Sequence, residues 1–233
     1  MAWQTGIGAD VSVDSVLVQE AQRTFMSRVY RWMFGGLALS GALALYTINN
    51  PALLSFVAHS FIFLIIAEFA MVIGLSWGAR RLSGAVAALM FVAYAALNGL
   101  TLSGVFLAYR LGTVGEAFVV TAGTYGAMSV YGAVTKKDLS GWGSFLFMGL
   151  FGLVLAGLVN MFLHSDLLSF VWSCAAIVVF AGLTAYDNQK LRAIHASAGY
   201  SSAGNLAILG ALTLYLDFVN LFLAVLRIFG RRR

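Results

Sequence analysis

The chain has 233 residues, of which 61% are hydrophobic and only 10% are charged, whereas a soluble domain carries roughly 25% charged residues. This composition excludes a soluble globular protein and predicts an integral membrane protein. The formal net charge of +5 could suggest a nucleic-acid partner, but the basic residues lie in short clusters between apolar segments. We therefore expect membrane lipid, and no nucleic acid, as a partner.

The first 22 residues are polar and contain no long apolar stretch. They predict a mobile cytoplasmic tail over residues 1–22, followed by a single transmembrane domain over residues 23–233. Arg23, Arg28 and Arg31 directly precede the first apolar segment. Because basic residues accumulate on the cytoplasmic side of membrane proteins, this cluster predicts a cytoplasmic N-terminus.

Seven apolar segments of 17 to 27 residues follow in chain order, and about 20 helical residues cross about 30 Å of hydrocarbon. Lipid offers the backbone no hydrogen-bond partner, so helices are expected, and the alternating segments of a barrel are absent. The segments cover residues 32–48, 52–77, 83–109, 117–134, 143–163, 167–186 and 205–229. The predicted fold class is an all-α integral membrane protein with seven transmembrane helices.

Two of these segments carry small residues four positions apart. Gly99 and Ser103 form one pair, and Gly152 and Ala156 form the other. Small residues at this spacing allow a neighbouring helix to approach closely. We therefore expect a close helix contact at each pair.

The distribution of basic residues predicts the orientation. With the N-terminus inside, the inner loops hold nine Lys or Arg residues and the outer loops between spans hold only Arg110. The nine are Arg23, Arg28, Arg31, Arg80, Arg81, Lys136, Lys137, Lys190 and Arg192. A full crossing by the last segment would carry Arg227 and the terminal 231–233 arginines outside, against this pattern. The segment either crosses or re-enters, and its length favours a crossing.

One acid, Asp217, lies in the middle of the last apolar segment, where an ionisable group marks a candidate functional site. A second acid, Asp187, ends the sixth segment. The polar loop over residues 197–205 is centred at residue 201, and the midpoint of the two acids is residue 202. Residues equally distant from the turn of an antiparallel hairpin lie at equal depth. If helix continues beyond Asp187, the two acids form a carboxylate pair inside the bundle.

Two carboxylates in close contact cannot easily both ionise, so such a pair shares a proton, binds a cation or recruits a basic partner. Hard oxygen ligands suit Ca²⁺ better than zinc or copper. Two acids fall short of the roughly six to eight oxygens that calcium takes, so calcium at Asp187 and Asp217 would be weakly held, and no tightly bound cofactor is expected. The alternative is structural: Asp187 caps or solvates a helix end, and Asp217 hydrogen-bonds to a neighbouring helix.

Other charged residues extend this candidate site. Glu68 lies within the second apolar segment and either lines an ion path or makes an interhelical hydrogen bond. Arg80 and Arg81 follow that segment and are anchors on the cytoplasmic side or basic partners for Asp187. The sequence contains no HExxH, GxGxxG, phosphate-loop or GxSxG motif, and the two aspartates lack the GxGD context of intramembrane proteases. We therefore expect no enzyme.

Several segments resemble the Bax inhibitor-1 family, also called the transmembrane Bax inhibitor motif family. They are FAGLTAYDNQKLR around Asp187, LTLYLDFVNLF around Asp217, AEFAMVIGLS at Glu68 and the AALNGLTLSGVF run. The resemblance extends over residues 24–230 and is closest to the bacterial branch, which implies the cytoplasmic (inner) membrane.

The resemblance implies a seven-helix fold in which the last helix is central and the other six wrap it. It also implies a pH-sensitive calcium leak in which Asp187 and Asp217 form a proton-sensitive latch with an arginine after the second helix. The segment WGARRL has Ala79 where relatives carry the arginine, which leaves Arg80 or Arg81 for this role. Bacterial relatives are also linked to the regulation of a membrane-bound AAA protease.

The leading hypothesis is a pH-sensitive, calcium-permeable leak channel. In it Asp187 and Asp217 sense protons and bind the cation, Arg80 or Arg81 forms the latch, and Glu68 lies on the ion path. One alternative is an interaction protein that modulates a membrane-bound AAA protease, with structural acids. Another is a proton-coupled transporter.

Overall fold

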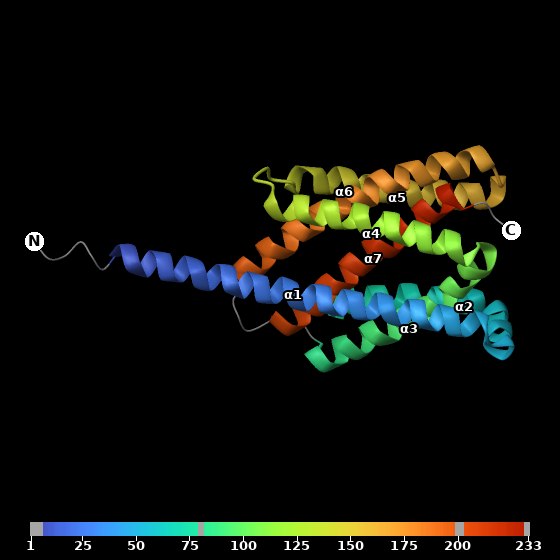
Figure 1. Cartoon of the computed structure of the whole chain (residues 1–233), viewed down its shortest axis with the longest axis horizontal. Coiled ribbons are helices and arrows are strands. Elements are labelled where there is room, and N and C mark those ends of the chain that lie inside the picture. The colour runs from blue at the N-terminus through green and yellow to red at the C-terminus, as the bar shows by residue number, and fades with distance from the viewer. Residues whose placement is uncertain (1–6, 79–81, 199–202, 231–233) are drawn as a thin grey trace, which may run out of the picture.

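The computed structural model describes residues 7–78, 82–198 and 203–230, which form seven helices and their connections and contain no strand (Figure 1). The helices are α1 (Ile7–Ile48), α2 (Pro51–Gly78), α3 (Gly84–Ala108), α4 (Leu111–Val134), α5 (Ser140–Leu163), α6 (Asp166–Ala198) and α7 (Ala203–Phe229). The predicted all-α class is confirmed. The boundaries agree with the apolar segments except that several helices extend beyond them into polar sequence.

Six of the seven helices, α2 to α7, are long and apolar enough to cross a membrane. The remaining helix, α1, becomes apolar only from Trp32 onward. The multi-pass character predicted from the sequence is therefore supported by six helices, and a crossing by α1 remains a prediction.

Helix α1 is much longer than its apolar part. Its 42 residues would extend about 63 Å, and its N-terminal end projects beyond the rest of the bundle (Figure 1). Residues 7–22, which the sequence predicts as a tail, belong to this helix. No Gly or Pro interrupts residues 9–34, so nothing in the local sequence ends the helix before the apolar segment.

Helix α2 begins at Pro51, one residue before the predicted segment. The side-chain oxygen of Asn50 accepts hydrogen bonds from the backbone N–H groups of Ala52 at 3.1 Å and Leu53 at 3.2 Å. Pro51, which has no N–H group, occupies the first helical position and fits there without losing a hydrogen bond. The cap and the proline together fix the sharp turn from α1 into α2.

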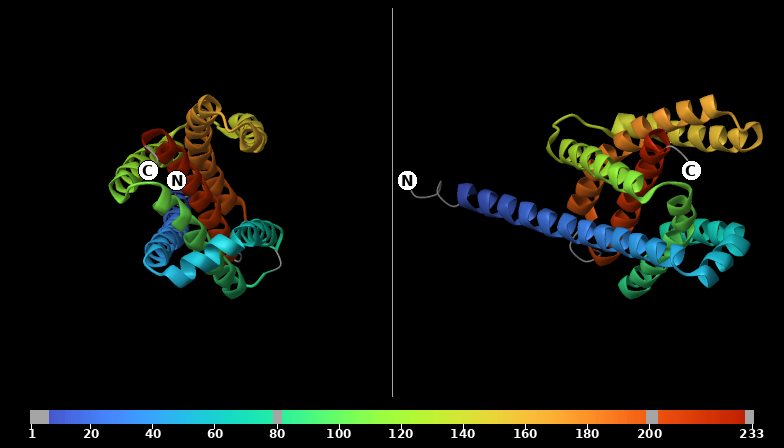
Figure 2. Two further views of the ribbon diagram at one scale, coloured as in Figure 1. Left: turned by 90° about the vertical axis from the view of Figure 1, so that its right-hand side faces the viewer. Right: turned by 45° about the vertical axis from the view of Figure 1, so that its right-hand side comes forward.

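The last helix, α7, is the most buried of the six potential spans. In its apolar window 72% of the residues are buried, against 11% to 39% in the other five. It packs against α1, α3, α4 and α6, and α5 lies at the outer edge of the bundle beside α6 (Figure 2). Wrapping of α7 by all six other helices remains a prediction, because its main contacts are with four of them.

Helix α7 is also unbroken from Ala203 to Phe229, and it runs from the end of the bundle where α6 finishes to the opposite end (Figure 1). This path favours a full crossing over a segment that re-enters. Helix α6 continues to Ala198, so the condition for placing Asp187 and Asp217 at equal depth is met.

The two predicted close contacts have different outcomes. A Cβ atom on Gly99 would lie 2.7 Å from the backbone oxygen of Ser40, so α1 and α3 approach each other there as predicted. At Gly152 no such neighbour lies within 4 Å, and the prediction of a close helix contact is wrong. Gly152 is on an exposed face of α5, which the spacing of small residues alone does not reveal.

Replacing Gly99 with alanine should destabilise the protein by about 1–3 kcal/mol, because the added methyl group overlaps the α1 backbone, which cannot move aside cheaply. The thermal unfolding midpoint of the purified protein in detergent measures this loss. Gly104→Ala is the matched control on the same helix, since a Cβ atom there meets nothing within 4 Å and alanine favours helix by up to about 1 kcal/mol. Equal midpoints for the two variants would contradict the close contact.

Candidate functional site

A cavity of about 930 Å³ lies between α5, α6 and α7 and also reaches Phe25 of α1 and Ser76 of α2. Both predicted acids, Asp187 on α6 and Asp217 on α7, line it. Most of the remaining lining is apolar. The cavity is therefore the place where the structure brings the two candidate residues together.

The backbone of α5 helps to shape this cavity. A Cβ atom on Gly143 would lie 2.5 Å from the ring of Tyr186, so only glycine leaves room for that ring against α5. Tyr186 directly precedes Asp187 and lines the same cavity. The packing of Tyr186 on Gly143 thus fixes the wall next to one of the acids.

The carboxyl groups of Asp187 and Asp217 lie close enough to form a hydrogen bond with each other. Asp217 is buried, with only 5% of its surface exposed, while Asp187 is half-buried. Among the described residues, no N–H or O–H group donates a hydrogen bond to the Oδ2 atom of Asp217. An ionised carboxylate only accepts hydrogen bonds, so a proton held by one of the two acids can supply the missing donor.

Two further groups face the pair. Lys190, one turn after Asp187 on α6, interacts electrostatically with that acid. The phenol of Tyr125 on α4 lies near both acids and donates a hydrogen bond to the sulfur of Met33 at 3.3 Å. The pair is therefore flanked by one cation on the side of α6 and by a neutral phenol on the side of α4.

The cavity offers oxygen atoms beyond the two acids. Thr213 and Asn220 line it and donate their own hydrogen bonds to backbone carbonyls of α7, at 3.2 Å and 2.8 Å, which leaves their side-chain oxygens able to accept or coordinate. Within the described parts of the chain, no group of three or more His, Cys, Asp or Glu side chains could hold a metal ion. Two carboxylates with neutral oxygens suit a weakly held calcium ion better than a tightly bound one.

The third acid, Glu68, lies elsewhere. Its carboxylate accepts hydrogen bonds from Thr101 at 2.7 Å and from the Asn98 amide at 3.4 Å, and it does not line the cavity of the aspartates. The interhelical hydrogen bond considered from the sequence is present. A place for Glu68 on an ion path stays a prediction.

Asn98 continues this polar contact into the protein interior. Its side-chain oxygen accepts a hydrogen bond from the phenol of Tyr215 at 2.8 Å, and that phenol lies 2.6 Å from the hydroxyl of Ser40. We name this series, from Glu68 through Asn98 and Tyr215 to Ser40, the Glu68–Ser40 chain. It joins α2, α3, α7 and α1.

A second buried contact lies next to Asp187. Asn188 is fully buried, accepts a hydrogen bond from the phenol of Tyr30 and donates one to the hydroxyl of Ser129 at 3.2 Å. These bonds join α6 to α1 and α4. Because a polar group in the membrane interior must find a partner, they fix the rotation of α6 and therefore the direction of Asp187.

Sequence reasoning missed the Glu68–Ser40 chain and the Asn188 contact. Asn98 appeared only as an amide within an apolar segment, and Tyr215 and Tyr30 resembled ordinary aromatic residues. The available signal was the occurrence of Asn98 inside a predicted span, since polar side chains there usually bond to another helix. Asn188 gave no such signal, because it lies two residues beyond the predicted end of the sixth segment. The partners of both amides could not be identified without the helix arrangement.

The predicted latch residues Arg80 and Arg81 lie outside the described residues. The nearest described part of α2 that reaches the cavity is Ser76. The latch therefore remains a prediction.

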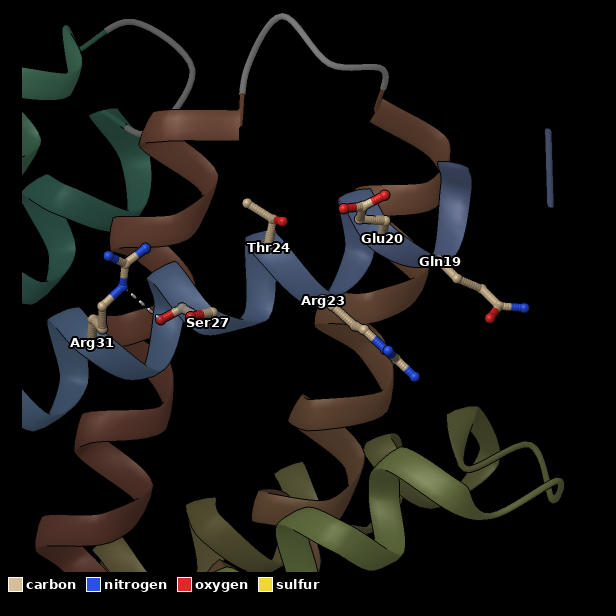
Figure 3. Close-up of a pocket in the computed structure, with 6 residues that line it drawn as sticks. All are labelled: Gln19, Glu20, Arg23, Thr24, Ser27 and Arg31. Carbon is tan, nitrogen blue, oxygen red and sulfur yellow. Dashed lines mark hydrogen bonds between the residues drawn. The ribbon is translucent and has the colours of Figure 1, made fainter. Parts of the chain in front are cut away.

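Another hollow lies along the exposed face of α1. Its six lining residues, Gln19, Glu20, Arg23, Thr24, Ser27 and Arg31, all belong to that one helix (Figure 3). The only hydrogen bond drawn among them joins the Arg31 side chain to the backbone oxygen of Ser27. Because all its described lining residues belong to one helix, it is a solvated basic face and not the candidate site.

Comparison with known proteins gives consistent matches along most of the chain. The family model described as "Inhibitor of apoptosis-promoting Bax1" matches residues 22–233. The inner membrane protein YbhL of Escherichia coli (strain K12) is 48% identical over 227 residues, which cover 94% of this chain and 97% of that protein. An uncharacterized protein of Deinococcus radiodurans is 50% identical over 212 residues, with 90% and 91% covered.

Replacing Tyr215 with phenylalanine should lower stability by about 1–3 kcal/mol, because the buried oxygen of Asn98 loses its donor while the ring packing is kept. Thermal unfolding in detergent measures the effect. Tyr46→Phe is the matched control, since Tyr46 is 60% exposed and its phenol should contribute little. A Tyr215→Phe midpoint equal to that of the wild type would contradict a stabilising role for the Glu68–Ser40 chain.

Proposed function

The chain belongs to the Bax inhibitor-1 family, and from this membership we propose that it is a pH-sensitive, calcium-permeable leak protein of the bacterial inner membrane. One observation carries the proposal: the carboxyl groups of Asp187 and Asp217 meet in a cavity between α5, α6 and α7. The proposal contains no catalytic step, and calcium and protons are its ligands.

In this proposal the aspartate pair is the proton sensor. At low pH both carboxyls are neutral, and the pair neither attracts a cation nor holds a basic partner. As pH rises, the pair acquires negative charge, binds calcium weakly through carboxylate oxygens and attracts a nearby arginine. The neutral oxygens of Thr213 and Asn220 would complete the weak cation site.

The burial of Asp217 supports a coupled pair. A buried carboxylate with an unpartnered oxygen is costly in the membrane interior, and sharing one proton with Asp187 removes that cost. Asp187 is half-buried whereas Asp217 is buried, so protons and cations would exchange through Asp187 before they reach Asp217. This order follows from the difference in exposure between the two acids.

The latch of the proposal is Arg80 or Arg81. Ser76 lines the aspartate cavity, and Arg80 follows it by four residues in the sequence. An arginine at this end of α2 would compete with calcium for the ionised pair. In the proposed orientation the N-terminus and this end of α2 face the cytoplasm, as the nine basic residues of the inner loops indicate.

Calcium flux into proteoliposomes containing only the purified protein tests the proposal. The wild-type flux should change with pH, and Asp187→Asn and Asp217→Asn should abolish that dependence. Asparagine is a neutral analogue of a protonated aspartic acid, so each variant at neutral pH should show the flux that the wild type has at acidic pH. An unchanged pH profile in both variants would refute the proton sensor.

Asp166→Asn is the matched control. Asp166 is an exposed acid at the start of α6, on the same helix as Asp187 but far from the cavity, and its loss should leave the pH profile unchanged. No flux in pure liposomes, together with co-purification of a membrane-bound AAA protease, would instead support the interaction protein. Proton uptake that depends on an added substrate would support a proton-coupled transporter.

A further inference from the structure

A second cavity, of about 620 Å³, lies between the α4–α5 connection and α6. Three lysines line it, Lys136 and Lys137 from the connection and Lys190 from α6, and we name it the lysine pocket. Unlike the basic face of α1, it is formed by two elements that are distant in the sequence. Lysines from both elements can therefore contact one bound group.

Hydrogen bonds between one α6 side chain and the backbone of the α4–α5 connection hold the lysine pocket in shape. The side-chain oxygen of Gln189 accepts from the N–H of Leu139 at 2.8 Å, and its amide donates to the carbonyl oxygen of Lys137 at 2.9 Å. The Gln189 side chain thus binds two backbone positions of the connection at once. The lysine backbone positions are set before any ligand arrives, which reduces the entropy lost on binding.

The pocket carries an excess of positive charge. Among its described lining residues, Asp138 is the one acid against three lysines, so the lining carries two positive charges in excess. Asp187, which lines the neighbouring cavity, also interacts with Lys190. Asp138 accepts a hydrogen bond from the N–H of Ser140 at 2.9 Å, and the bonds from Ser140 hold the pKa of that carboxyl below its usual range. Asp138 therefore stays ionised and engaged at the start of α5, while the lysine side chains are exposed.

The pocket lies at the depth of lipid headgroups. Lys190 is about 36 Å along α6 from its first residue, Asp166, whereas the hydrocarbon core is about 30 Å thick. With Asp166 at the opposite boundary, Lys190 lies at the edge of the hydrocarbon on the side that the charge pattern predicts as cytoplasmic. Trp142, at the start of α5, is 62% exposed, and exposed tryptophan is typical of the same interfacial layer.

We propose that the lysine pocket binds the phosphate-containing headgroup of an anionic membrane phospholipid. The lysines contact the phosphate, and the apolar atoms of Ala193, Ile194 and the Tyr186 ring, which also line the pocket, contact the glycerol and the first part of the acyl chains. A zwitterionic lipid would bring a choline cation into a pocket with excess positive charge. The site therefore selects an anionic lipid.

The lysine pocket shares a wall with the aspartate cavity. Tyr186, Lys190 and Ile194 line both, and Lys190 interacts electrostatically with Asp187. A headgroup on Lys190 would lie directly beside the candidate site. The lipid assignment does not depend on the proposed calcium leak, because it rests on the lysines, the depth and the fixed connection.

Native mass spectrometry of the full chain in detergent, with phosphatidylglycerol or phosphatidylcholine added, tests the site. The wild type should retain phosphatidylglycerol in preference to phosphatidylcholine. Each basic residue near a membrane surface strengthens the binding of anionic lipid. The triple variant Lys136→Gln, Lys137→Gln, Lys190→Gln should therefore bind phosphatidylglycerol at least about tenfold more weakly. Equal retention of the two lipids by the wild type would overturn the proposal.

The double variant Arg28→Gln, Arg31→Gln is the matched control, because these exposed arginines lie on α1 at the same end of the protein but outside the lysine pocket. It should retain phosphatidylglycerol as the wild type does. An equal loss in both variants would show diffuse attraction and overturn the site. Displacement of the lipid by millimolar inorganic phosphate would assign the pocket to a free anion instead.

Two further variants separate binding from folding. Replacing all three lysines with arginine keeps the charge and should preserve retention of phosphatidylglycerol. The double variant Lys136→Gln, Lys137→Gln changes only exposed side chains of the connection and should lose part of the binding with an unchanged unfolding midpoint. Full retention of phosphatidylglycerol in a folded double variant would contradict the role of the connection.

Discussion

The arrangement of the helices depends on one constraint: the carboxyl group of Asp217 cannot face lipid. An ionisable group within an apolar transmembrane segment costs several kcal/mol unless it faces protein or water. Helix α7 meets this constraint by packing against α1, α3, α4 and α6, and Asp217 is directed to the cavity that α5 and α6 help to line. The other helices can keep broad apolar faces toward lipid because α7 is inside.

The two faces of α7 make different interactions. Tyr215 and Asp217 are two positions apart, so their side chains point to different sides of the helix. Tyr215 hydrogen-bonds into the Glu68–Ser40 chain, which joins α7 to α1, α2 and α3, while Asp217 faces Asp187. One side of α7 is therefore held by neutral hydrogen bonds, and the other carries the group that can change its charge.

Much of this arrangement could be predicted from particular residues. The apolar segments located the helices, and the positions of Asp187 and Asp217 around the polar loop predicted that they meet, because an antiparallel hairpin relates depth to distance from its turn. The close approach at Gly99 was predicted correctly, whereas the one at Gly152 was wrong.

Helices that are apolar on every side do not show in sequence which face meets lipid. The partners of Tyr215 and Asn188 likewise depend on how helices distant in the chain are rotated, which no local pattern encodes.

The helices that bound the aspartate cavity differ in how much of each is buried in the protein. In their apolar windows, 72% of the residues of α7 are buried but only 11% of those of α2 and of α5. Elements with few buried contacts open at a lower free-energy cost than the core does. A change in charge at the aspartate pair would therefore be accommodated by movement of α5 or the end of α2, while α7 stays fixed by its neighbours. Gly143 and Ser76 place these two helices against the cavity, so the more weakly held elements also line the cavity of the two acids.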